Sequence, residues 1–339
     1  MKKLLVLFLI LFGAPILVAC GNNDDLTLTE EVGQNEVEQT SEQPQPAPPA
    51  AQAPGATSET LTIGDMVFNV TYTELDLSDK QLTEEDISDL RYMTNLTSLD
   101  LSNNSILDLS QTPIPQLTSL RHLDLSSNQI TDEWHREMYS LEDIAPLAGL
   151  TNLTHLNIGR NSIEDISPLA NLTNLTNLDL TSNNIGDISP LARLTNLENL
   201  QINTLINVDL SYIANLTSLE SLGVAMNRLE DITPLANLTN LTWLDISGNH
   251  GLRDITPLRG LTNLWYLSLA NAAINDLTPL AGLRNLYWLS LSDLNWGNDP
   301  LTDLSPLANL TSLGILLLYG HGNYITDWSP VAHVAQVFP

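Results

Sequence analysis

A repeated pattern of about 22 residues constrains the fold of this 339-residue chain more than any other feature. From residue 72 to about residue 330 the pattern L-x-x-L-x-L-x-x-N-x-I/L-x-D-I-x-P-L-A-x-L-T-x recurs. With its first Leu numbered as position 1, the pattern begins at Tyr72, Leu96, Leu120, Leu153, Leu175, Leu197, Leu219, Leu241, Leu264, Leu286 and Leu313. A fixed period of this length is typical of a solenoid, in which each repeat is one coil that buries its apolar face against its neighbours. The sequence therefore predicts an elongated stack of eleven coils.

Each position of the repeat has a predicted role, which the coil beginning at Leu175 illustrates. Leu178 and Leu180 alternate with polar residues, and this alternation predicts a short strand with one buried face. Asn183, at position 9, can satisfy backbone groups at a bend through both its amide and its carbonyl. Ser189-Pro190 predicts the cap and the first residue of a helical turn. Stacked coils then form a parallel sheet with a strand spacing of about 4.8 Å on the concave side.

The 22-residue period and the D-I-x-P-L-A half-motif resemble the internalin-type class of bacterial leucine-rich repeats. The resemblance covers residues 72–330 and is clearest over residues 153–204. It implies an α/β solenoid, a leucine-rich-repeat horseshoe with a parallel concave sheet and short helical or 3-10 turns on the convex side. It also implies that the concave sheet binds a protein on another cell, often a host receptor, although no individual contact residue carries over.

The first twenty residues indicate export. Two lysines precede an uncharged run over residues 4–19, which is shorter than the roughly 20 residues of a membrane-spanning helix and predicts a signal peptide over residues 1–19. The sequence around Cys20, the only cysteine of the chain, resembles the bacterial lipoprotein box, in which the thiol is alkylated by diacylglycerol. The resemblance implies a lipid anchor at the bacterial cell envelope, with a structural or accidental cysteine as the alternative.

Residues 20–60 are predicted to form a disordered tether that ends before the repeats. Residues 21–60 contain eight acidic residues, no Lys or Arg, and a Pro-rich stretch at residues 43–49. Such a segment cannot bury enough apolar surface to offset the entropy lost on ordering. We expect it to act as a spacer between a membrane and the repeats.

The repeat region is predicted to consist of an N-terminal cap with the first coil, residues 61–95, and of further coils with a short C-terminal cap, residues 96–339. Residues 61–63 and 67–70 read as cap strands, and Thr83 as the start of a short helix. The third coil has about eleven surplus residues, 133–143. Trp134, Met138 and Leu141 lie there at i, i+4 and i+7, which predicts a helical excursion.

Charge and motifs exclude several classes of function. The 40 acidic residues outnumber the 12 basic residues and give a net charge of −28, whereas a nucleic-acid-binding protein needs a basic face. The chain contains no G-x-S-x-G, no H-E-x-x-H and no phosphate-binding glycine loop, so we predict that it is not an enzyme and uses no cofactor.

An Asp recurs at position 13 of nine coils. We interpret these carboxylates as caps of helical turns, where they satisfy free N–H groups and the helix dipole, rather than as a ladder of cation ligands. The nine residues are Asp108, Asp165, Asp187, Asp209, Asp231, Asp254, Asp276, Asp303 and Asp327.

Positions 2 and 3 of each coil lie on the concave sheet, where the solenoid core does not need them. Large aromatic residues occupy these positions in three adjacent coils, and Tyr319 follows at position 7 of the last coil. Exposed clusters of Trp and Tyr usually mark a recognition surface. The alternative is that the rings stack on one another beneath the C-terminal cap. The candidate ligand-binding residues are Trp243, Trp265, Tyr266, Tyr287, Trp288 and Tyr319.

Three further features of the repeats remain open to interpretation. His122 and His155 occupy position 3 of neighbouring coils, where they either share a metal ion or respond to pH, or serve as polar filler. An intermittent acidic stripe at position 5 favours a basic partner, with simple solvation as the alternative; it consists of Asp100, Asp124, Asp179 and Asp245. The position 9 Asn is replaced in four coils, by Leu205, Ala272, Leu294 and His321.

Together these features predict a surface-anchored, non-enzymatic binding module or adhesin. We expect it to recognise a protein ligand, from a host or from the envelope, through the concave face. The first alternative is a carbohydrate- or peptidoglycan-binding envelope lipoprotein, because sugar rings stack well on Trp. The second alternative is an envelope scaffold without a diffusible ligand.

Overall fold

The computed structural model describes residues 60–131, 138–205, 207–293, 300–320 and 324–339. The chain separates into two units, residues 1–54 and 55–339, and only the second contains described residues. The predicted signal peptide, Cys20, nearly all of the tether, Trp134, Leu294 and His321 lie outside the described residues. Within them, no helix is long and apolar enough to span a membrane.

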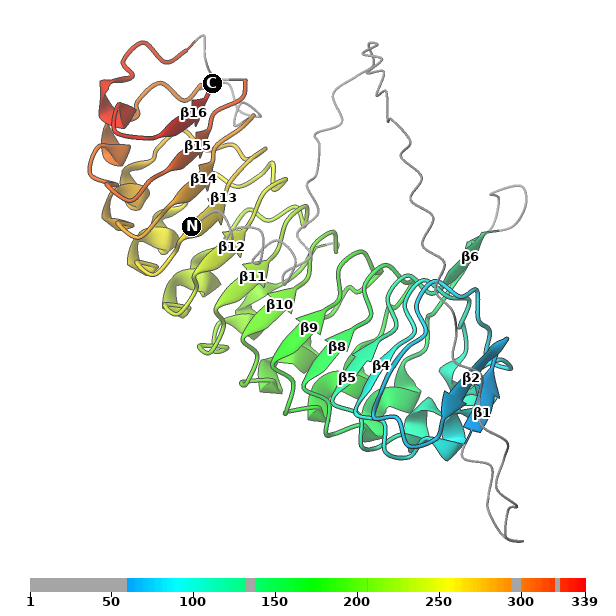
Figure 1. Cartoon of the computed structure of the whole chain (residues 1–339). Coiled ribbons are helices and arrows are strands. Elements are labelled where there is room, and N and C mark those ends of the chain that lie inside the picture. Colours follow the sequence, from blue (N-terminus) through cyan, green and yellow to red (C-terminus); the bar gives the residue numbers. More distant parts are fainter. Residues whose placement is uncertain (1–59, 132–137, 206, 294–299, 321–323) are drawn as a thin grey trace, which may run out of the picture. The chain divides into compact units, whose positions relative to one another are not determined.

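A twelve-stranded parallel sheet runs through the described part of the unit (Figure 1). Its strands follow one another in sequence order, and equivalent positions pair, as Leu178 and Leu200 do. The strands are β3 (Glu74–Asp76), β4 (Ser98–Asp100), β5 (His122–Asp124), β8 (His155–Asn157), β9 (Asn177–Asp179), β10 (Asn199–Gln201), β11 (Ser221–Gly223), β12 (Trp243–Asp245), β13 (Tyr266–Ser268), β14 (Trp288–Ser290), β15 (Ile315–Leu317) and β16 (Gln336–Phe338).

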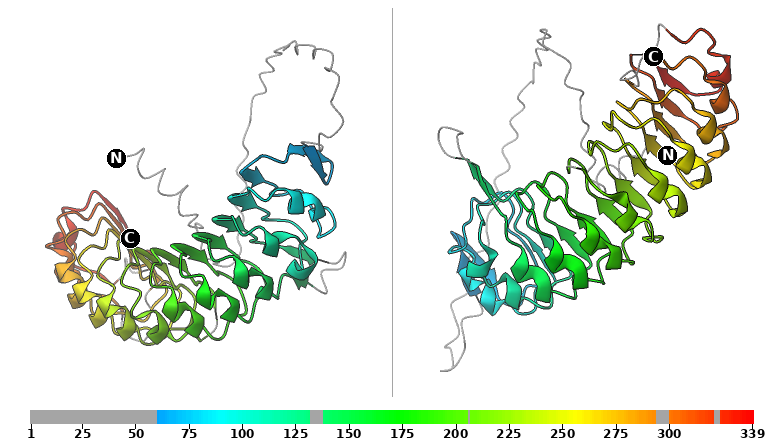
Figure 2. Two further views of the ribbon diagram at one scale, coloured as in Figure 1. Left: turned by 90° about the horizontal axis from the view of Figure 1, so that it is seen from below. Right: turned by 180° about the vertical axis from the view of Figure 1, so that it is seen from behind.

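Short 3-10 helices form the other side of the coils. They line the outer side of the arc that the coils follow, and the strands line its inner side (Figure 2). They are η1 (Ser88–Tyr92), η2 (Leu109–Gln111), η3 (Ile114–Gln116), η4 (Ala145–Gly149), η5 (Ser167–Asn171), η6 (Ser189–Arg193), η7 (Leu210–Ile213), η8 (Thr233–Asn237), η9 (Thr256–Gly260), η10 (Thr278–Gly282), η11 (Ser305–Leu307) and η12 (Ser329–Val331). The predicted leucine-rich-repeat solenoid, with a parallel concave sheet and 3-10 turns, is confirmed.

The sheet has one strand more than the eleven coils predict. The segment expected to be the short C-terminal cap, an apolar plug that ends the stack, contains η12 and β16, and β16 pairs with β15 so that Val337 lies opposite Leu316. Val331 and Val334 are buried, whereas Phe338 is exposed. The plug therefore begins a twelfth coil.

The core is a continuous column of Leu and Ile from successive coils. Leu178 and Leu180 are buried, as are Ile185 and Ile188 of the same coil. Side chains of buried Asn residues run alongside this column at position 9. Asn183 donates from Nδ2 to the carbonyls of Ile158 (3.0 Å) and Leu180 (2.9 Å), and its Oδ1 accepts the N–H of Ile163 at 3.0 Å. The predicted use of both amide functions is thus what the structure contains.

A left-handed residue turns the chain out of the sheet at position 8 of every coil. Glycine adopts this conformation at little cost, and Asn and Asp tolerate it better than most residues do. The residues with positive φ at this position are Asp79, Asn103, Ser127, Arg160, Ser182, Thr204, Met226, Gly248, Asn271, Asp293 and Gly320.

The Asp at position 13 accepts a hydrogen bond where the outer helical turn begins. Each of the nine residues accepts, through Oδ1, the N–H of the residue two positions later at 2.7–2.9 Å. The expectation that Ser189 is the cap is wrong: its N–H donates to Asp187, and its hydroxyl donates to the same carboxylate. Because Ser189 is itself the first residue of η6, the acceptor has to lie before it.

The described residues of the third coil's surplus form a strand and not the predicted helix. β7 (Met138–Ser140) pairs antiparallel with β6 (Gln129–Thr131) (Figure 1), and Tyr139 is exposed. The chain returns at Leu141, which is buried where the next coil has Ile163. The hairpin therefore lets the chain leave the coil and re-enter it at an equivalent core position.

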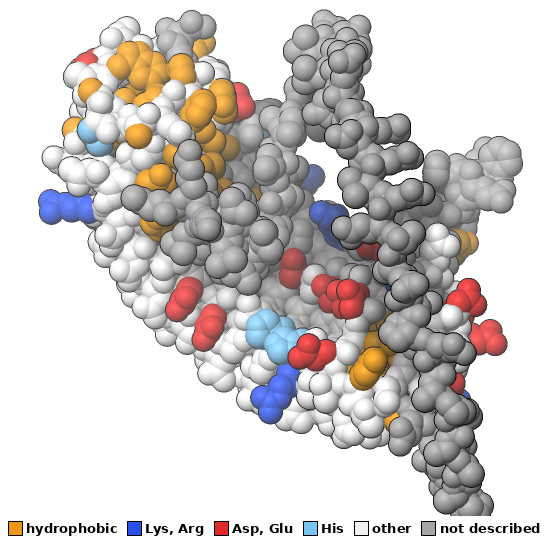
Figure 3. All heavy atoms as spheres, viewed as in Figure 1, with side chains coloured by type: hydrophobic (Ala, Val, Ile, Leu, Met, Phe, Trp, Pro, Cys, Tyr) orange, Lys and Arg blue, Asp and Glu red, His pale blue; other side chains and the backbone are white. Residues whose placement is uncertain are grey.

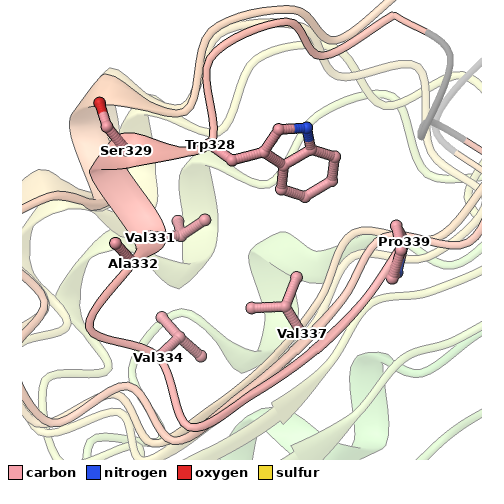
Figure 4. Close-up of a pocket in the computed structure, with 7 residues that line it drawn as sticks. All are labelled: Trp328, Ser329, Val331, Ala332, Val334, Val337 and Pro339. Carbon is pink, nitrogen blue, oxygen red and sulfur yellow. The ribbon is translucent and has the colours of Figure 1, made fainter.

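The two ends of the sheet differ. At the N-terminal end β1 (Thr60–Ile63) and β2 (Met66–Asn69) form an antiparallel pair, and Ile87, Leu90 and Met93 are buried beside them. At the C-terminal end an open apolar hollow lies against the last coil (Figure 4). The hollow is lined by Trp328, Ser329, Val331, Ala332, Val334, Val337 and Pro339.

Candidate ligand-binding surface on the concave sheet

Five of the six predicted binding residues come together on the concave face. They form two stacked rows, one at position 3 and one at position 2. In the first row the ring centroids of Trp243 and Tyr266 are 5.1 Å apart, and those of Tyr266 and Trp288 are 4.2 Å apart. In the second row the Trp265 and Tyr287 centroids are 5.2 Å apart. We call these five residues the aromatic surface.

The rows follow from the register of the sheet. β12, β13 and β14 pair so that Trp243 lies opposite Tyr266 and Tyr266 lies opposite Trp288. Neighbouring strands are about 4.8 Å apart, close to the separation of offset-stacked rings. Interplanar angles of 7–14° show that the rings use this spacing. The stacking part of the alternative interpretation is therefore present in the structure.

Gly314 closes one end of the second row. A Cβ at this position would clash with the Tyr287 ring, so the backbone of Gly314 packs directly against that ring. Gly314 follows Tyr287 at position 2 of the next coil. The ring of Tyr287 is consequently held between Trp265 and the Gly314 backbone.

Burial and the nearby Asp245 change the pKa of the Tyr266 hydroxyl in the first row. Only 8% of Trp243 is exposed. Burial raises the pKa of the Tyr266 hydroxyl, and the charge of Asp245 raises it further. Burial also raises the pKa of Asp245, although hydrogen bonds from Ser247 and Ser268 partly offset the effect. Tyr266 thus remains a neutral hydrogen-bonding phenol at any physiological pH.

Tyr319 does not belong to the stacked rows. It is 49% exposed, and its ring lies 6.3 Å from that of Phe338 in β16. The sequence placed it at position 7, and the structure places it beside the start of the twelfth coil. It borders the C-terminal end, where hydrophobic side chains gather in the space-filling view (Figure 3).

The carboxylates of the acidic stripe at position 5 accept hydrogen bonds from the backbone. The Oδ1 atoms of Asp100, Asp124, Asp179 and Asp245 accept the N–H of position 7 in the same coil at 2.8–2.9 Å. Asn157 makes the same bond to Gly159 at 3.1 Å. These carboxylates are therefore turn-forming groups, and simple solvation does not describe them. Burial raises the pKa of Asp124 and of Asp179.

In one coil the N–H at position 7 donates to a side chain of the preceding coil instead of to the residue at position 5. Position 5 is Gly223, and the N–H of Ala225 instead donates to Asn203 Oδ1 of the preceding coil at 2.8 Å. A Cβ on Gly223 would collide with Gln201 and Asn203, whose side chains fill the space. This arrangement was not predicted from the sequence. Its signal was the coincidence of a Gly at position 5 with an Asn at position 7 one coil earlier.

A second ladder of Asn residues was also missed. The Asn immediately before position 1 donates from Nδ2 to a Thr carbonyl of the preceding coil at 2.8–2.9 Å in five coils, as Asn174 does to Thr151. Asn152 makes the same bond to Thr118 across the hairpin coil. The recurring T-N-L triplet marks this ladder in the sequence.

The two histidines are adjacent. His122 in β5 pairs with His155 in β8, and their ring centroids are 4.4 Å apart. Burial lowers the pKa of His155, the neighbouring His122 lowers it further, and Glu198 acts in the opposite direction. Among the described residues there is no group of three or more His, Cys, Asp or Glu side chains that could hold a metal ion.

Comparisons with known proteins agree with the repeat architecture. A family model described as Leucine rich repeat matches residues 72–132, and a second one matches residues 149–166 and 171–188. A comparison with curated proteins found no match.

Three solved structures resemble this chain. An internalin, InlF, from Listeria monocytogenes is 31% identical with a TM-score of 0.61, and the match covers 80% of this chain and 89% of that one. The ectodomain of the Arabidopsis thaliana receptor kinase GASSHO1/SCHENGEN3, in complex with CASPARIAN STRIP INTEGRITY FACTOR 2, is 25% identical with a TM-score of 0.56; the match covers 73% of this chain and 32% of that one.

The third structure, the functional domain of InlJ from Listeria monocytogenes, is 21% identical with a TM-score of 0.51, and the match covers 79% of this chain and 72% of that one. At that identity it supports the fold alone. The likeness to InlF extends over most of both chains and agrees with the coil period, the parallel sheet and the outer 3-10 turns. The chain belongs to the internalin family of bacterial leucine-rich-repeat proteins.

Proposed function

We propose that the aromatic surface binds a protein ligand and that the chain is a non-enzymatic binding module or adhesin. The observation that carries this proposal is the placement of five large aromatic residues on the concave face of three adjacent strands. The column of buried Leu and Ile already supplies the core of these coils. Trp and Tyr are the residue types that dominate binding energies at protein interfaces.

The geometry of the rings favours a protein over a carbohydrate. Stacking of a sugar needs a free ring face. Trp243 and Trp288 cover the two faces of Tyr266, and Trp265 and the Gly314 backbone cover the two faces of Tyr287. The central rings of both rows therefore offer edges and polar tips, which suit the mixed apolar and hydrogen-bonding contacts of a protein surface. Binding of carbohydrate or peptidoglycan remains the second candidate, because sugar rings stack well on Trp.

The proposed location is the bacterial cell surface. A signal peptide over residues 1–19, lipidation of Cys20 and a tether over residues 20–60 would export the chain and hold it at the envelope. Support for this part comes from the lipoprotein-box resemblance and from the likeness to an internalin. A protein on a host cell or in the envelope is then the natural ligand class.

A binding experiment with two matched pairs of substitutions tests the proposal. The full chain serves as bait for surface proteins of host cells and for envelope proteins, and the affinity for any captured protein is then measured. Trp265→Ala combined with Trp288→Ala should weaken binding by about tenfold or more, since interface aromatic anchors contribute about 2 kcal/mol or more. Tyr92→Ala combined with Tyr212→Ala, two exposed tyrosines outside the aromatic surface, should leave the affinity unchanged.

Because the rings also stack, the substitutions could affect folding. Circular dichroism therefore checks that both double variants are folded at the temperature of the binding measurement. Equal affinity of the two pairs would overturn the proposal for this surface. A chain that captures no protein but binds glycans on an array would support the carbohydrate candidate. A chain that binds neither would be left with the role of an envelope scaffold.

A further inference from the structure

His122 and His155 form a pair that the aromatic surface does not use. They lie directly opposite each other on the neighbouring parallel strands β5 and β8, and both side chains are exposed to solvent. Their ring centroids are 4.4 Å apart, with an angle of 47° between the planes. Two bonds from nitrogen to a metal of about 2.0–2.1 Å each require the two nitrogen atoms to lie at most about 4 Å apart, and rings this close on neighbouring strands can reach that separation by side-chain rotation.

Thr154 offers a hydrogen-bonding partner to His155. The Thr154 hydroxyl oxygen lies 3.1 Å from the Arg121 carbonyl oxygen and 2.9 Å from His155 Nδ1. Threonines at the equivalent position of other coils, Thr97 and Thr242, donate to the preceding coil in the same way. When the hydroxyl donates to Arg121, its oxygen can accept a hydrogen from Nδ1 of His155. In that tautomer the lone pair of His155 is on Nε2, free for a metal ion.

This arrangement is the one that metal-binding histidines use. A ligating His usually donates its other ring N–H to a protein acceptor, which orients the ring and fixes the tautomer. Nearby Asp124 is not available as a third ligand, because its Oδ1 accepts from Ser126 and its Oδ2 accepts from Asn157 at 2.8 Å. The protein would supply two nitrogen donors, and water would complete the coordination.

We propose that His122 and His155 bind one divalent transition-metal ion of the kind that prefers imidazole, with Cu²⁺ bound more tightly than Zn²⁺. Imidazole nitrogen suits Cu, Ni and Zn, and Cu²⁺ stands highest in the general order of affinities. The site lies on the polar part of the concave sheet, and it does not depend on what the aromatic surface binds.

Titration of the full chain with Cu²⁺ and separately with Zn²⁺ tests the site. All samples carry Cys20→Ser, so that no thiol competes for the ion. Calorimetry should show one ion per chain in the tightest phase. His122→Ala and His155→Ala should each weaken that phase by about tenfold or more, and Thr154→Val should weaken it by about tenfold through loss of the oriented tautomer. His250→Ala, which removes an exposed histidine in another coil, should leave it unchanged.

A spectroscopic measurement on the chain with both histidines present completes the test. Electron paramagnetic resonance of the Cu²⁺-loaded chain should show coupling to two imidazole nitrogens. Absence of a one-to-one phase, coupling to a single nitrogen, or an affinity that survives the loss of both histidines would each overturn the proposal. In those cases the pair is polar filler of the concave sheet.

Discussion

The concave sheet has two parts that share one backbone and differ in surface. In the polar part, from β4 to β10, position 3 holds Ser, His and Asn. In the aromatic part, from β12 to β14, positions 2 and 3 hold the stacked rings. Both parts have the same in-register pairing and the same buried Leu at position 4. The fold thus requires an apolar core residue at position 4, whereas the residues at positions 2 and 3 differ between the two parts.

The parts also differ in which side chains form hydrogen bonds to backbone groups. Asn at position 9 runs through most of the polar part and recurs as the buried Asn249 in the coil of β12, whereas the coil of β13 has the buried Ala272 there. Between the two parts lies the coil of Gly223, where Asn203 supplies the bond that an Asp makes elsewhere. The difference teaches that the coil of β13 lacks the position 9 side-chain bonds that Asn makes in other coils, while ring stacking adds contacts in the aromatic part.

The largest expected effect is the loss of stability when the Asn183 side chain is removed from the polar part. Asn183→Ala leaves the buried Leu180 carbonyl and the buried Ile163 N–H without a partner, whereas the Ile158 carbonyl keeps its bond from Asn161. Each such group costs about 1–3 kcal/mol, so we expect a loss of about 3 kcal/mol or more in the free energy of unfolding. Urea unfolding followed by circular dichroism measures it.

Asn174→Ala is the matched control for this change. It removes one exposed bond, from Nδ2 to the Thr151 carbonyl, in the same coil region. We expect a loss below about 1 kcal/mol, because an exposed group exchanges its partner for water. Equal losses for Asn174 and Asn183 would show that burial of the position 9 ladder is not what stabilises the polar part.

A smaller effect is expected from crowding the aromatic part. Gly314→Ala introduces a methyl group where the Tyr287 ring lies and must displace the second stacked row. Overpacking of this kind costs about 1–3 kcal/mol. Near-ultraviolet circular dichroism should show the altered Trp265 and Tyr287 environment, and binding of the protein ligand should weaken. Gly282→Ala, at a glycine with no atom near its missing Cβ, is the control. Unchanged stability and unchanged near-ultraviolet spectra would mean that the Tyr287 ring moves without cost.

The smallest expected effect is a pH dependence of the stability contributed by Asp179. Burial raises the pKa of Asp179, so its carboxylate costs stability above that pKa, and the cost disappears as the pH falls and the group is protonated. Asp179→Asn keeps an oxygen to accept the Thr181 N–H, as Asn157 does for Gly159. We expect it to stabilise the protein by about 0.5 kcal/mol at pH 7, a typical size for a single polar substitution outside the core. The gain should vanish toward pH 3.

The Asp residues at position 13 are expected to show the opposite dependence of stability on pH. Hydrogen bonds from the N–H and the hydroxyl of Ser167 lower the pKa of Asp165, so its contribution is present above the unfolded pKa and is lost as the pH falls through the folded pKa. Thermal unfolding of the wild type and of Asp165→Asn between pH 3 and pH 7 checks this direction. If Asp165→Asn and Asp179→Asn responded to pH in the same way, the assignment of the two carboxylates to different environments would be wrong.

Features tied to a position in the repeat could be predicted from the sequence. The buried Leu178, the Asn183 bonds and the Asp187 cap all recur at a fixed place, so one coil explains the others. The hairpin at β6 and β7 could not be read in this way, because an insertion has no repeat register to fix its structure. The spacing of Met138 and Leu141 fitted a helix equally well on sequence grounds.

The candidate surface was only partly predictable. Its membership follows from positions 2 and 3, but the stacking depends on strand spacing and ring rotamers that no single coil reveals. The close approach of Gly314 to Tyr287 likewise joins residues 27 positions apart in the chain.

The strand order of the sheet has a mechanical consequence. Each strand from β3 to β16 pairs only with the strands before and after it in the sheet order, so a force that separates the two ends of the sheet loads the terminal coil first. Under tension the chain should unzip stepwise, releasing about 75 Å of extended chain for each 22-residue coil. A molecule built in this way yields gradually when pulled, and its remaining coils keep their shape while the outermost ones give way.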